Sequence, residues 1–339
     1  MPIDLFIKAP VGLLPVFLFL LVLVYMDSYK LVRLRLVLWV ILAGAALTVV
    51  GYFINSWLFQ VLGWDLNDFS RYASPVVEES LKALVMVFLF RTHRIGFLVD
   101  SAILGFAVGA GFALIETFYY LYTVPDAHML VWVVRGFGTA IMHGGAMALF
   151  GVMAQSLTER SMRINPILYL PGLIVAITLH SIFNHFPGTP ILTTLGTLLI
   201  LPAILVEVFR RSARSMHDWL ELDFDDNVRL LDQINSGEFA ETNAGRFLND
   251  LKQKFSGEVV VDMLCYLRLY TELALRAKGV LMMRENGLEA PIGERTREKM
   301  EEMDYLEKSI GKTGYLAIRP LVQMTRKDLW QLCMLEKGR

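Results

Sequence analysis

Long apolar stretches alternate with short polar segments through the first 214 residues of the chain. Because backbone groups in lipid must be satisfied within the segment, runs of this kind are predicted to be helices. Most of them approach the roughly 20 residues that a helix needs to cross a bilayer. The pattern therefore predicts an all-α membrane bundle of about seven transmembrane helices, near 9–26, 36–60, 75–90, 97–122, 132–157, 167–186 and 190–209.

The overall composition agrees with a membrane protein. Of the 339 residues, 55% are hydrophobic and 19% are charged, and the mean hydropathy is +0.49. This is too apolar for an ordinary soluble protein of this length. The net charge of −1 gives no reason to expect a nucleic-acid partner. The first run lacks a basic leader and a cleavage site, so it is predicted to be a retained span.

Basic residues gather in alternate loops, which sets the predicted orientation. Cytoplasmic loops carry an excess of Lys and Arg. The loops after the first, third, fifth and seventh runs hold the basic residues, namely Lys30, Arg33, Arg35, Arg91, Arg94, Arg160, Arg163, Arg210, Arg211 and Arg214. The chain is therefore predicted to lie in the cell membrane with its N-terminus outside and its C-terminal part in the cytoplasm.

The composition changes after Arg214. Residues 215–339 are polar and contain no run of spanning length, and their two cysteines offer no CxxC metal site. Apolar residues at helical spacing predict helices over 258–285, 294–310 and 316–337, the last two separated by Gly311–Gly314. We therefore expect a transmembrane bundle at 1–214 and a small helical cytoplasmic domain at 215–339. An amphipathic helix in this domain would suit a cytoplasmic protein partner.

Two adjacent carboxylates and an ammonium lie in the first turns of the third run. A charge in hydrocarbon costs several kcal/mol, so such groups usually face a bundle interior or a wet cavity. Helical spacing lets Lys82 neutralise either Glu78 or Glu79. The pair alone is equally compatible with a buried salt bridge that holds two helices together.

Other spans carry polar residues at a matching depth. Glu116 lies near the end of the fourth run, and Arg135 and His143 lie in the first half of the fifth. His180 and Asn184 close the sixth run, four residues apart on one helical face. Since successive spans run in opposite directions, all these residues and the Glu78 pair are predicted to gather in the outer half of the bilayer. Nearer the inner side, Asp100 and Glu207 are predicted to form interfacial pairs with neighbouring arginines.

This collection of side chains suits peptide hydrolysis. Two histidines and a carboxylate can hold Zn²⁺ with a position left open for water. A second carboxylate can act as the general base, and an Asn or Arg can stabilise the developing oxyanion. A proton-coupled transporter is the main alternative, because Glu, His and Arg also build proton relays. A non-catalytic membrane signalling receptor is a further alternative. No inverted repeat is visible, which argues against the transporter.

At this point the chain resembles a known family. The segments Glu78-Glu79-x-x-Lys82, Phe112-x-x-x-Glu116 and His180-x-x-x-Asn184, with Arg135 and His143 between them, are similar to motifs of the PrsW-type intramembrane proteases. That family is related to the type II CAAX prenyl endopeptidases and their bacterial relatives. Two features depart from the pattern: Thr117 stands where the family often has Asn, and the CAAX relatives have His at the position of Glu116.

The resemblance implies that the bundle at 1–214 is protease-like, with its motif core at 75–186, and that the chain is a membrane-embedded endopeptidase of the metallo or glutamic type. It implies that the substrate is a membrane protein in the lipid bilayer, such as a single-span anti-sigma factor. Cleavage would occur on the outer side, as the first step of a signalling cascade. The catalytic residues that we expect are Glu78, Glu79, Glu116, His143, His180 and Asn184.

Individual roles follow from the chemistry and the resemblance together. Glu78 is the expected general base, with Glu79 as its partner. His143 and His180 are expected to bind Zn²⁺, or to orient water if no metal binds, and Glu116 is a third ligand or a second carboxylate. Asn184 is expected to donate to the oxyanion or the substrate backbone. The supporting charges are Lys82 and Arg135.

Overall fold

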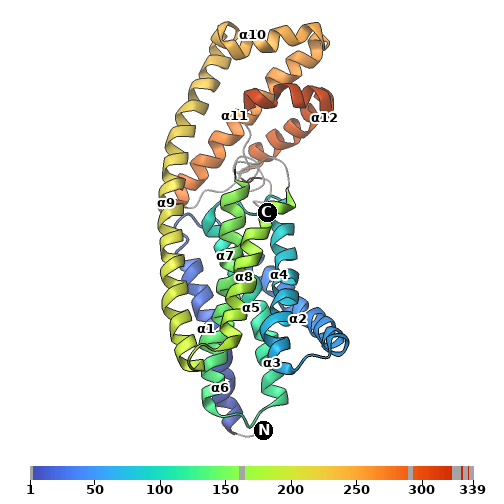
Figure 1. Ribbon diagram of the computed structural model, residues 1–339. Helices are drawn as coiled ribbons and strands as arrows, with labels where there is room; N and C mark the ends of the chain where they lie inside the picture. Colours follow the sequence, from blue (N-terminus) through green and yellow to red (C-terminus); the bar gives the residue numbers. More distant parts are fainter. Residues whose placement is uncertain (1–2, 160–164, 289–292, 323–329, 331–334, 336–339) are drawn as a thin grey trace. The chain divides into compact units, whose positions relative to one another are not determined.

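Helices form every regular element of the described chain. The computed structural model describes residues 3–159, 165–288, 293–322, 330 and 335 (Figure 1). No strand occurs among these residues. Contacts divide the chain into two units, Met1–Ser212 and Ala213–Arg339, and each is considered by itself.

The first unit is a bundle whose long helices run alternately up and down in Figure 1. Its α-helices are α1 (Ile3–Tyr25), α2 (Leu34–Leu62), α3 (Leu66–Asp68), α4 (Ser74–Arg91), α5 (Leu98–Thr123), α6 (Met129–Val133), α7 (Ala140–Thr158), α8 (Leu170–His185) and the first part of α9 (Pro190–Ser236). Two π-helical segments, η1 (Phe69–Ala73) and η2 (Val134–Thr139), and the 3₁₀ turn η3 (Pro166–Tyr169) complete it.

Six segments of the described chain are long and apolar enough to span a membrane. They correspond to α1, α2, α5, α6 to α7, η3 to α8, and α9. The prediction of an all-α polytopic membrane bundle is therefore confirmed. The third predicted run is α4, which has 18 residues and is not among the six. Its charged first turns lower its hydropathy, although Met86 and Phe90 in its second half are fully buried.

Helix α5 forms the centre of the bundle, and every residue from Val99 to Ala113 is buried. Its glycines allow this position, because neighbouring backbones lie directly against them. A Cβ on Gly109 would stand 2.2 Å from the carbonyl oxygen of His143 on α7. A Cβ on Gly111 would stand 2.0 Å from the carbonyl oxygen of Ile41 on α2. Close approach through small residues is a usual device of membrane helices, and it brings α2, α5 and α7 together.

The contacts of Asp100 and Glu207 test the predicted pairs with arginines. Glu207 accepts a hydrogen bond from Arg211 Nε at 2.8 Å, which confirms that prediction for Glu207. The prediction for Asp100 was wrong, because Asp100 is buried and its two oxygens accept from the backbone of Gly96 and Phe97. Asp100 thus satisfies free N–H groups at the start of α5, as an acidic residue in a first turn often does.

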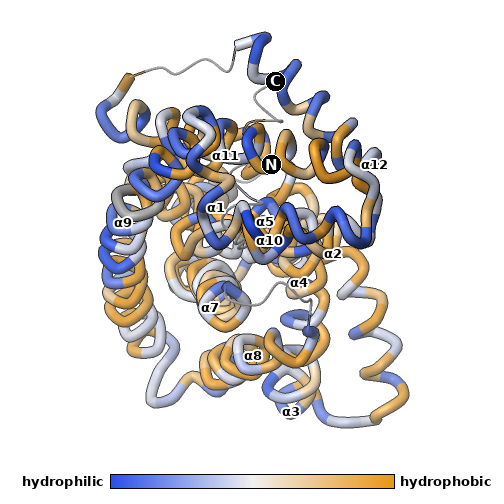
Figure 2. The backbone as a smooth tube through the Cα atoms, turned by 90° about the horizontal axis from the view of Figure 1, so that it is seen from above, coloured by the Kyte–Doolittle hydropathy of each residue, from blue (hydrophilic) through white to orange (hydrophobic). Residues whose placement is uncertain are grey.

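The second unit holds the rest of α9, α10 (Asn243–Asp250), α11 (Gly257–Glu285) and α12 (Glu294–Val322), with the 3₁₀ turns η4 (Glu238–Glu241) and η5 (Leu251–Gln253). Figure 2 shows that α10 is largely hydrophilic, whereas α7 and α8 of the first unit are largely apolar. The predicted break at Gly311–Gly314 is a kink at Gly311, where φ is 70°. Most of the predicted helix beyond Val322, like Arg160 and Arg163, lies outside the described residues.

Candidate active site

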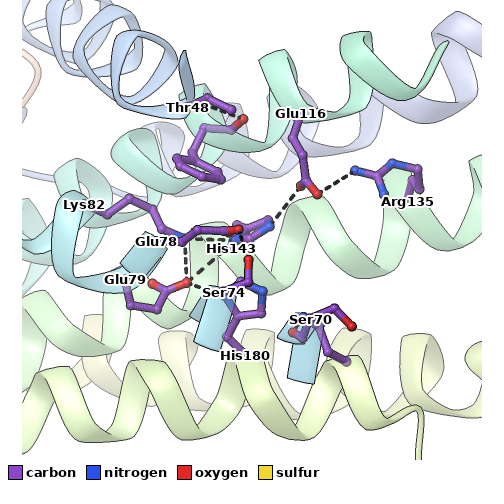
Figure 3. Close-up of polar contacts among 12 residues, drawn as sticks. Thr48, Ser70, Ser74, Glu78, Glu79, Lys82, Glu116, Arg135, His143 and His180 are labelled. Atoms are coloured by element: carbon purple, nitrogen blue, oxygen red, sulfur yellow. Dashed lines mark hydrogen bonds and ion pairs between the residues drawn. The ribbon is translucent and has the colours of Figure 1, made fainter. Parts of the chain in front are cut away.

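The polar residues of four helices and one π-helical segment converge in the first unit (Figure 3). They surround a cavity of about 640 Å³. Six of the predicted residues line it, namely Glu78, Glu116, Arg135, His143, His180 and Asn184. The remaining two, Glu79 and Lys82, are completely buried behind this lining. The fold therefore brings together the residues that the sequence analysis expected to meet.

Glu79 is the centre of the buried network. Its Oε1 accepts from Lys82 Nζ at 2.5 Å and contacts His180 Nδ1 at 2.8 Å. His143 Nδ1 lies 3.7 Å from the same oxygen. The other oxygen, Oε2, is buried and has no hydrogen-bond partner. Glu79 therefore connects α4 to α8. It binds the Nδ1 edge of the His180 ring, and Nε2 lies on the opposite edge.

His143 links the buried network to Glu116. Its Nδ1 lies 2.9 Å from Lys82 Nζ, and its Nε2 lies 3.1 Å from Glu116 Oε2. A protonated lysine can only donate, so Nδ1 accepts and the ring hydrogen belongs on Nε2, directed at Glu116. The ring also lies edge-on to His180, with centroids 4.6 Å apart. Both ring nitrogens of His143 are thus occupied by protein contacts.

Glu116 and Arg135 form the outer part of the site. Arg135 Nη2 lies 3.1 Å from Glu116 Oε1, and the guanidinium carbon lies 3.8 Å from the centre of the Tyr120 ring. The Glu116 side chain is 25% exposed, in contrast to the fully buried Glu79. Arg135 comes from η2, and one extra residue per turn in a π-helix redirects the side chains that it carries. Glu116 therefore remains reachable from the cavity while its charge is balanced.

Glu78 is held by a separate set of contacts. Its Oε1 accepts from Ser74 Oγ at 2.5 Å and from Asn55 Nδ2 at 3.2 Å. Asn55 Nδ2 also donates to Ser74 Oγ at 3.1 Å. Unlike Glu79, Glu78 is only half-buried and lines the cavity. The two adjacent carboxylates thus occupy different environments, one facing the cavity and one facing the protein interior.

Asn184 also lines the cavity, and its side chain binds a backbone oxygen. Its Nδ2 donates to the carbonyl oxygen of Ser70 in η1 at 2.8 Å. One turn earlier, Ser181 Oγ donates to the carbonyl oxygen of Arg71 at 2.7 Å. These two bonds fasten α8 to the π-helical segment that precedes α4. An Asn amide carries two N–H donors, so one remains for another acceptor.

Among the described residues, one group has the composition and spacing of a metal site. Glu78, His143 and His180 each offer a ligand atom, and the three atoms lie within 4.8 Å of one another. His180 suits this role directly, because a carboxylate on Nδ1 fixes the ring and leaves Nε2 for a metal. His143 can join only by giving up its contact with Lys82 or with Glu116. The group contains Glu78, whereas the sequence prediction had placed Glu116 beside the two histidines.

Several residues of the site were not predicted. Asn55 and Ser74 hold Glu78, Ser70 accepts from Asn184, and Tyr120 covers Arg135. A signal existed for Asn55, because an amide in an apolar spanning run needs a partner. Ser74, four residues before Glu78, lies one helical turn from it and could have been found by spacing alone. Ser70 contributes a backbone oxygen, which no sequence pattern identifies.

The fold and the site together define a class of protein. A polytopic helical bundle with carboxylates and imidazoles around an internal cavity is suited to hydrolysis within a membrane. The model of the PrsW family intramembrane metalloproteases matches residues 32–207, and the chain belongs to this family. No curated protein and no solved structure gives a significant match.

Family membership gives the protein its general activity. It is an intramembrane protease, a hydrolase of the metalloprotease kind, and a multi-pass membrane protein. An enzyme of this kind acts on a membrane protein in the lipid bilayer. The matched region, 32–207, includes α2 and therefore reaches beyond the predicted motif core of 75–186.

Proposed function

We propose that the cavity hydrolyses a peptide bond of a membrane-protein substrate near the outer face of the membrane, with water activated by Glu78. The observation that carries this proposal is the meeting of Glu78, His143 and His180 at one wall of the cavity. A general base must be able to reach the water that it deprotonates. Glu78 lines the cavity and Glu79 does not, which supports Glu78 as the base and Glu79 as its buried partner.

The residues around Glu78 suit the remaining tasks of hydrolysis. His180, fixed by Glu79, presents its second nitrogen to the reacting groups. The second N–H of Asn184 is suited to the developing oxyanion or to a substrate carbonyl, because its first N–H is used on Ser70. Lys82 and Arg135 compensate Glu79 and Glu116, which supports an electrostatic role for both cations.

A metal, if held, would bind to Glu78, His143 and His180. The donor set is typical of zinc, and Zn²⁺ bound there would supply Lewis acidity and a more acidic water. Glu116, which is bonded to His143 and is 25% exposed, is then a second carboxylate in the cavity. Without a metal, Glu78 alone accepts the proton of the attacking water, as in a glutamic protease.

Metal analysis of the purified full-length protein separates these two arrangements. If the metal arrangement is correct, the protein holds close to one Zn²⁺ per chain, and the paired change His143→Ala with His180→Ala removes it. Removal of zinc by a chelator would then abolish cleavage. Metal-free protein with full, chelator-resistant cleavage would instead establish the glutamic arrangement.

The resemblance and the charge pattern support a particular substrate and side. We infer that the substrate is a single-span protein such as an anti-sigma factor, cut on the outer side. Glu116 lies near the end of α5 and Asn184 near the end of α8, so the site lies toward the end of the bundle that contains the α5–α6 and α8–α9 connections, which Figure 1 shows together. These connections belong to the loops that are poor in Lys and Arg and are therefore expected outside.

Reconstitution with a fluorescently tagged single-span anti-sigma factor tests the proposal. The wild-type protein should release a cut fragment, and Glu78→Gln and His180→Ala should reduce its rate by at least about a hundredfold. Glu207→Gln is a matched control, because Glu207 is a carboxylate on α9 that pairs with Arg211 away from the cavity. Cleavage that persists in both site variants would refute the proposed site.

A further inference from the structure

Asn55 is the residue of α2 that reaches the cavity carboxylate. Helix α2 lies outside the predicted motif core, yet Asn55 Nδ2 donates both to Glu78 Oε1 at 3.2 Å and to Ser74 Oγ at 3.1 Å. Ser74 Oγ in turn donates to the same Glu78 oxygen at 2.5 Å. Two donors from two helices thus converge on one oxygen of Glu78, and its second oxygen is left for the cavity.

The orientation of the Asn55 amide follows from this contact. A carboxylate only accepts hydrogen bonds, so the NH₂ end of the amide must face Glu78. The carbonyl end, Oδ1, is consequently buried and has no hydrogen-bond partner in the structure. A buried acceptor without a partner is unfavourable. Leucine, which has a similar shape, would lose both this acceptor and the two hydrogen bonds of Nδ2, so it isolates the contribution of the amide group.

Close contacts with α5 fix the position of helix α2, which carries Asn55. Gly111 on α5 packs against the backbone of Ile41, and Gly44 on α2 packs against the backbone of Val108. One turn further along, Thr48 Oγ1 donates to the carbonyl oxygen of Phe112 at 3.1 Å. Asn55 lies two turns after Thr48 and hence on the same face of α2. The amide is therefore presented to Glu78 from a rigid support.

We propose that Asn55 is a positioning residue of the active site, which holds the Glu78 carboxylate in the orientation needed to accept the proton of the attacking water. The proposal rests on the proposed function of Glu78. Asn55 does not contact the reacting atoms and acts only through Glu78, together with Ser74. Its loss should lower the rate of the chemical step, while substrate binding is retained.

A melting-temperature cycle tests the contact without any substrate. The full-length protein is compared with Asn55→Leu, Glu78→Met and the double variant. If Asn55 is bonded to Glu78, the change in melting temperature caused by Asn55→Leu should differ by about 2–4 °C between the wild-type protein and the Glu78→Met variant. The cycle of Gln60→Leu with Glu78→Met is the matched control, because Gln60 is an exposed amide on the same helix. Additive shifts in the Asn55 cycle would overturn the proposal.

Cleavage kinetics test the positioning role. With the tagged anti-sigma factor, Asn55→Leu should lower kcat by about 10- to 100-fold and leave KM unchanged, while the melting temperature is maintained. Gln60→Leu should keep wild-type kcat. An Asn55→Leu protein with normal kcat, or with a melting temperature that falls in step with activity, would overturn the proposal. Failure of the wild-type protein to cut would defeat the proposed function instead, and the melting cycle would still decide the contact.

Discussion

At the scale of single residues, the site depends on a lysine whose side chain is completely buried. Lys82 and Glu79 are both completely buried, and bringing charges out of water costs several kcal/mol each. The bond of 2.5 Å between them offsets part of this cost. The Lys82 ammonium also lies 4.6 Å from the centre of the Phe112 ring and donates to His143. The sequence could predict the ion pair from helical spacing, but it could not predict which carboxylate would be buried.

The two adjacent glutamates should respond differently to the same substitution. Glu79→Gln leaves the Lys82 charge buried and uncompensated, so we expect a loss of about 3–5 kcal/mol in the free energy of unfolding. Glu78→Gln leaves the ion pair intact and should lower the cleavage rate by at least about a hundredfold, with a nearly unchanged melting temperature. Thermal melting in detergent, measured with cleavage, separates the two effects.

The double variant Lys82→Met with Glu79→Leu provides the control for this prediction. It removes both charges, so it should be more stable than Glu79→Gln alone. If Glu79→Gln were as stable as the wild-type protein, the buried pair would not have the structural importance assigned to it.

At the scale of helices, the hydrophobic pattern predicted most elements but not their local irregularities. The apolar runs correspond to α1, α2, α4, α5, α7, α8 and the first part of α9. The segments η1 and η2 were not predicted, because one extra residue in a turn hardly changes the average hydrophobicity of a run. Both segments matter to the site: η1 accepts from Asn184 and leads into Glu78, and η2 carries Arg135. The sequence could predict that these side chains meet in one part of the bundle, whereas the exact facing of each side chain could not be predicted.

Close packing of α5 on α7 should be as important as any polar contact for the position of His143. We expect Gly109→Ala to lower the melting temperature and the cleavage rate together, because its Cβ would stand 2.2 Å from the His143 carbonyl oxygen. Overpacking of this kind typically costs about 1–3 kcal/mol. Thermal melting and cleavage of the same preparations provide the measurement.

Gly196→Ala on α9 is the control for the packing prediction. A Cβ on Gly196 would meet no atom within 4 Å, so this substitution should leave both quantities near the wild-type values. It could even raise stability slightly, because alanine has the higher helix propensity. Equal effects of the two alanine substitutions would contradict the importance of the α5–α7 contact.

At the scale of the whole molecule, orientation in the membrane decides where cleavage occurs. The helix order alone gives two orientations, and only the distribution of Lys and Arg favours one of them. A cysteine introduced at Thr189, in the exposed connection between α8 and α9, should react with a membrane-impermeant thiol reagent on intact cells. A cysteine introduced at Ser215 should react only after the cells are opened. The opposite pattern would place the site on the cytoplasmic side and rule out an outer-face cleavage.

The second unit should not take part in peptide-bond chemistry. The residues that surround the cavity all belong to the first unit, and the family match ends at residue 207. The hydrocarbon core of a bilayer is roughly 30 Å thick, so a cytoplasmic domain would be separated from a site near the outer face. We expect residues 215–339 to form a regulatory or partner-docking domain, in which α11 buries an apolar face that includes Met263, Leu267 and Leu273.

Removal of residues 215–339 therefore should leave cleavage in detergent, with a change only in substrate selection or in control. The truncated and full-length proteins are compared by the rate of fragment release from the same tagged single-span substrate. Size-exclusion chromatography and thermal melting establish whether the truncated bundle is folded and keeps its oligomeric state. The bundle alone contains every residue assigned to hydrolysis, so a folded truncated protein should still cut. If it cuts no substrate of the full-length chain, the C-terminal unit belongs to the catalytic machinery.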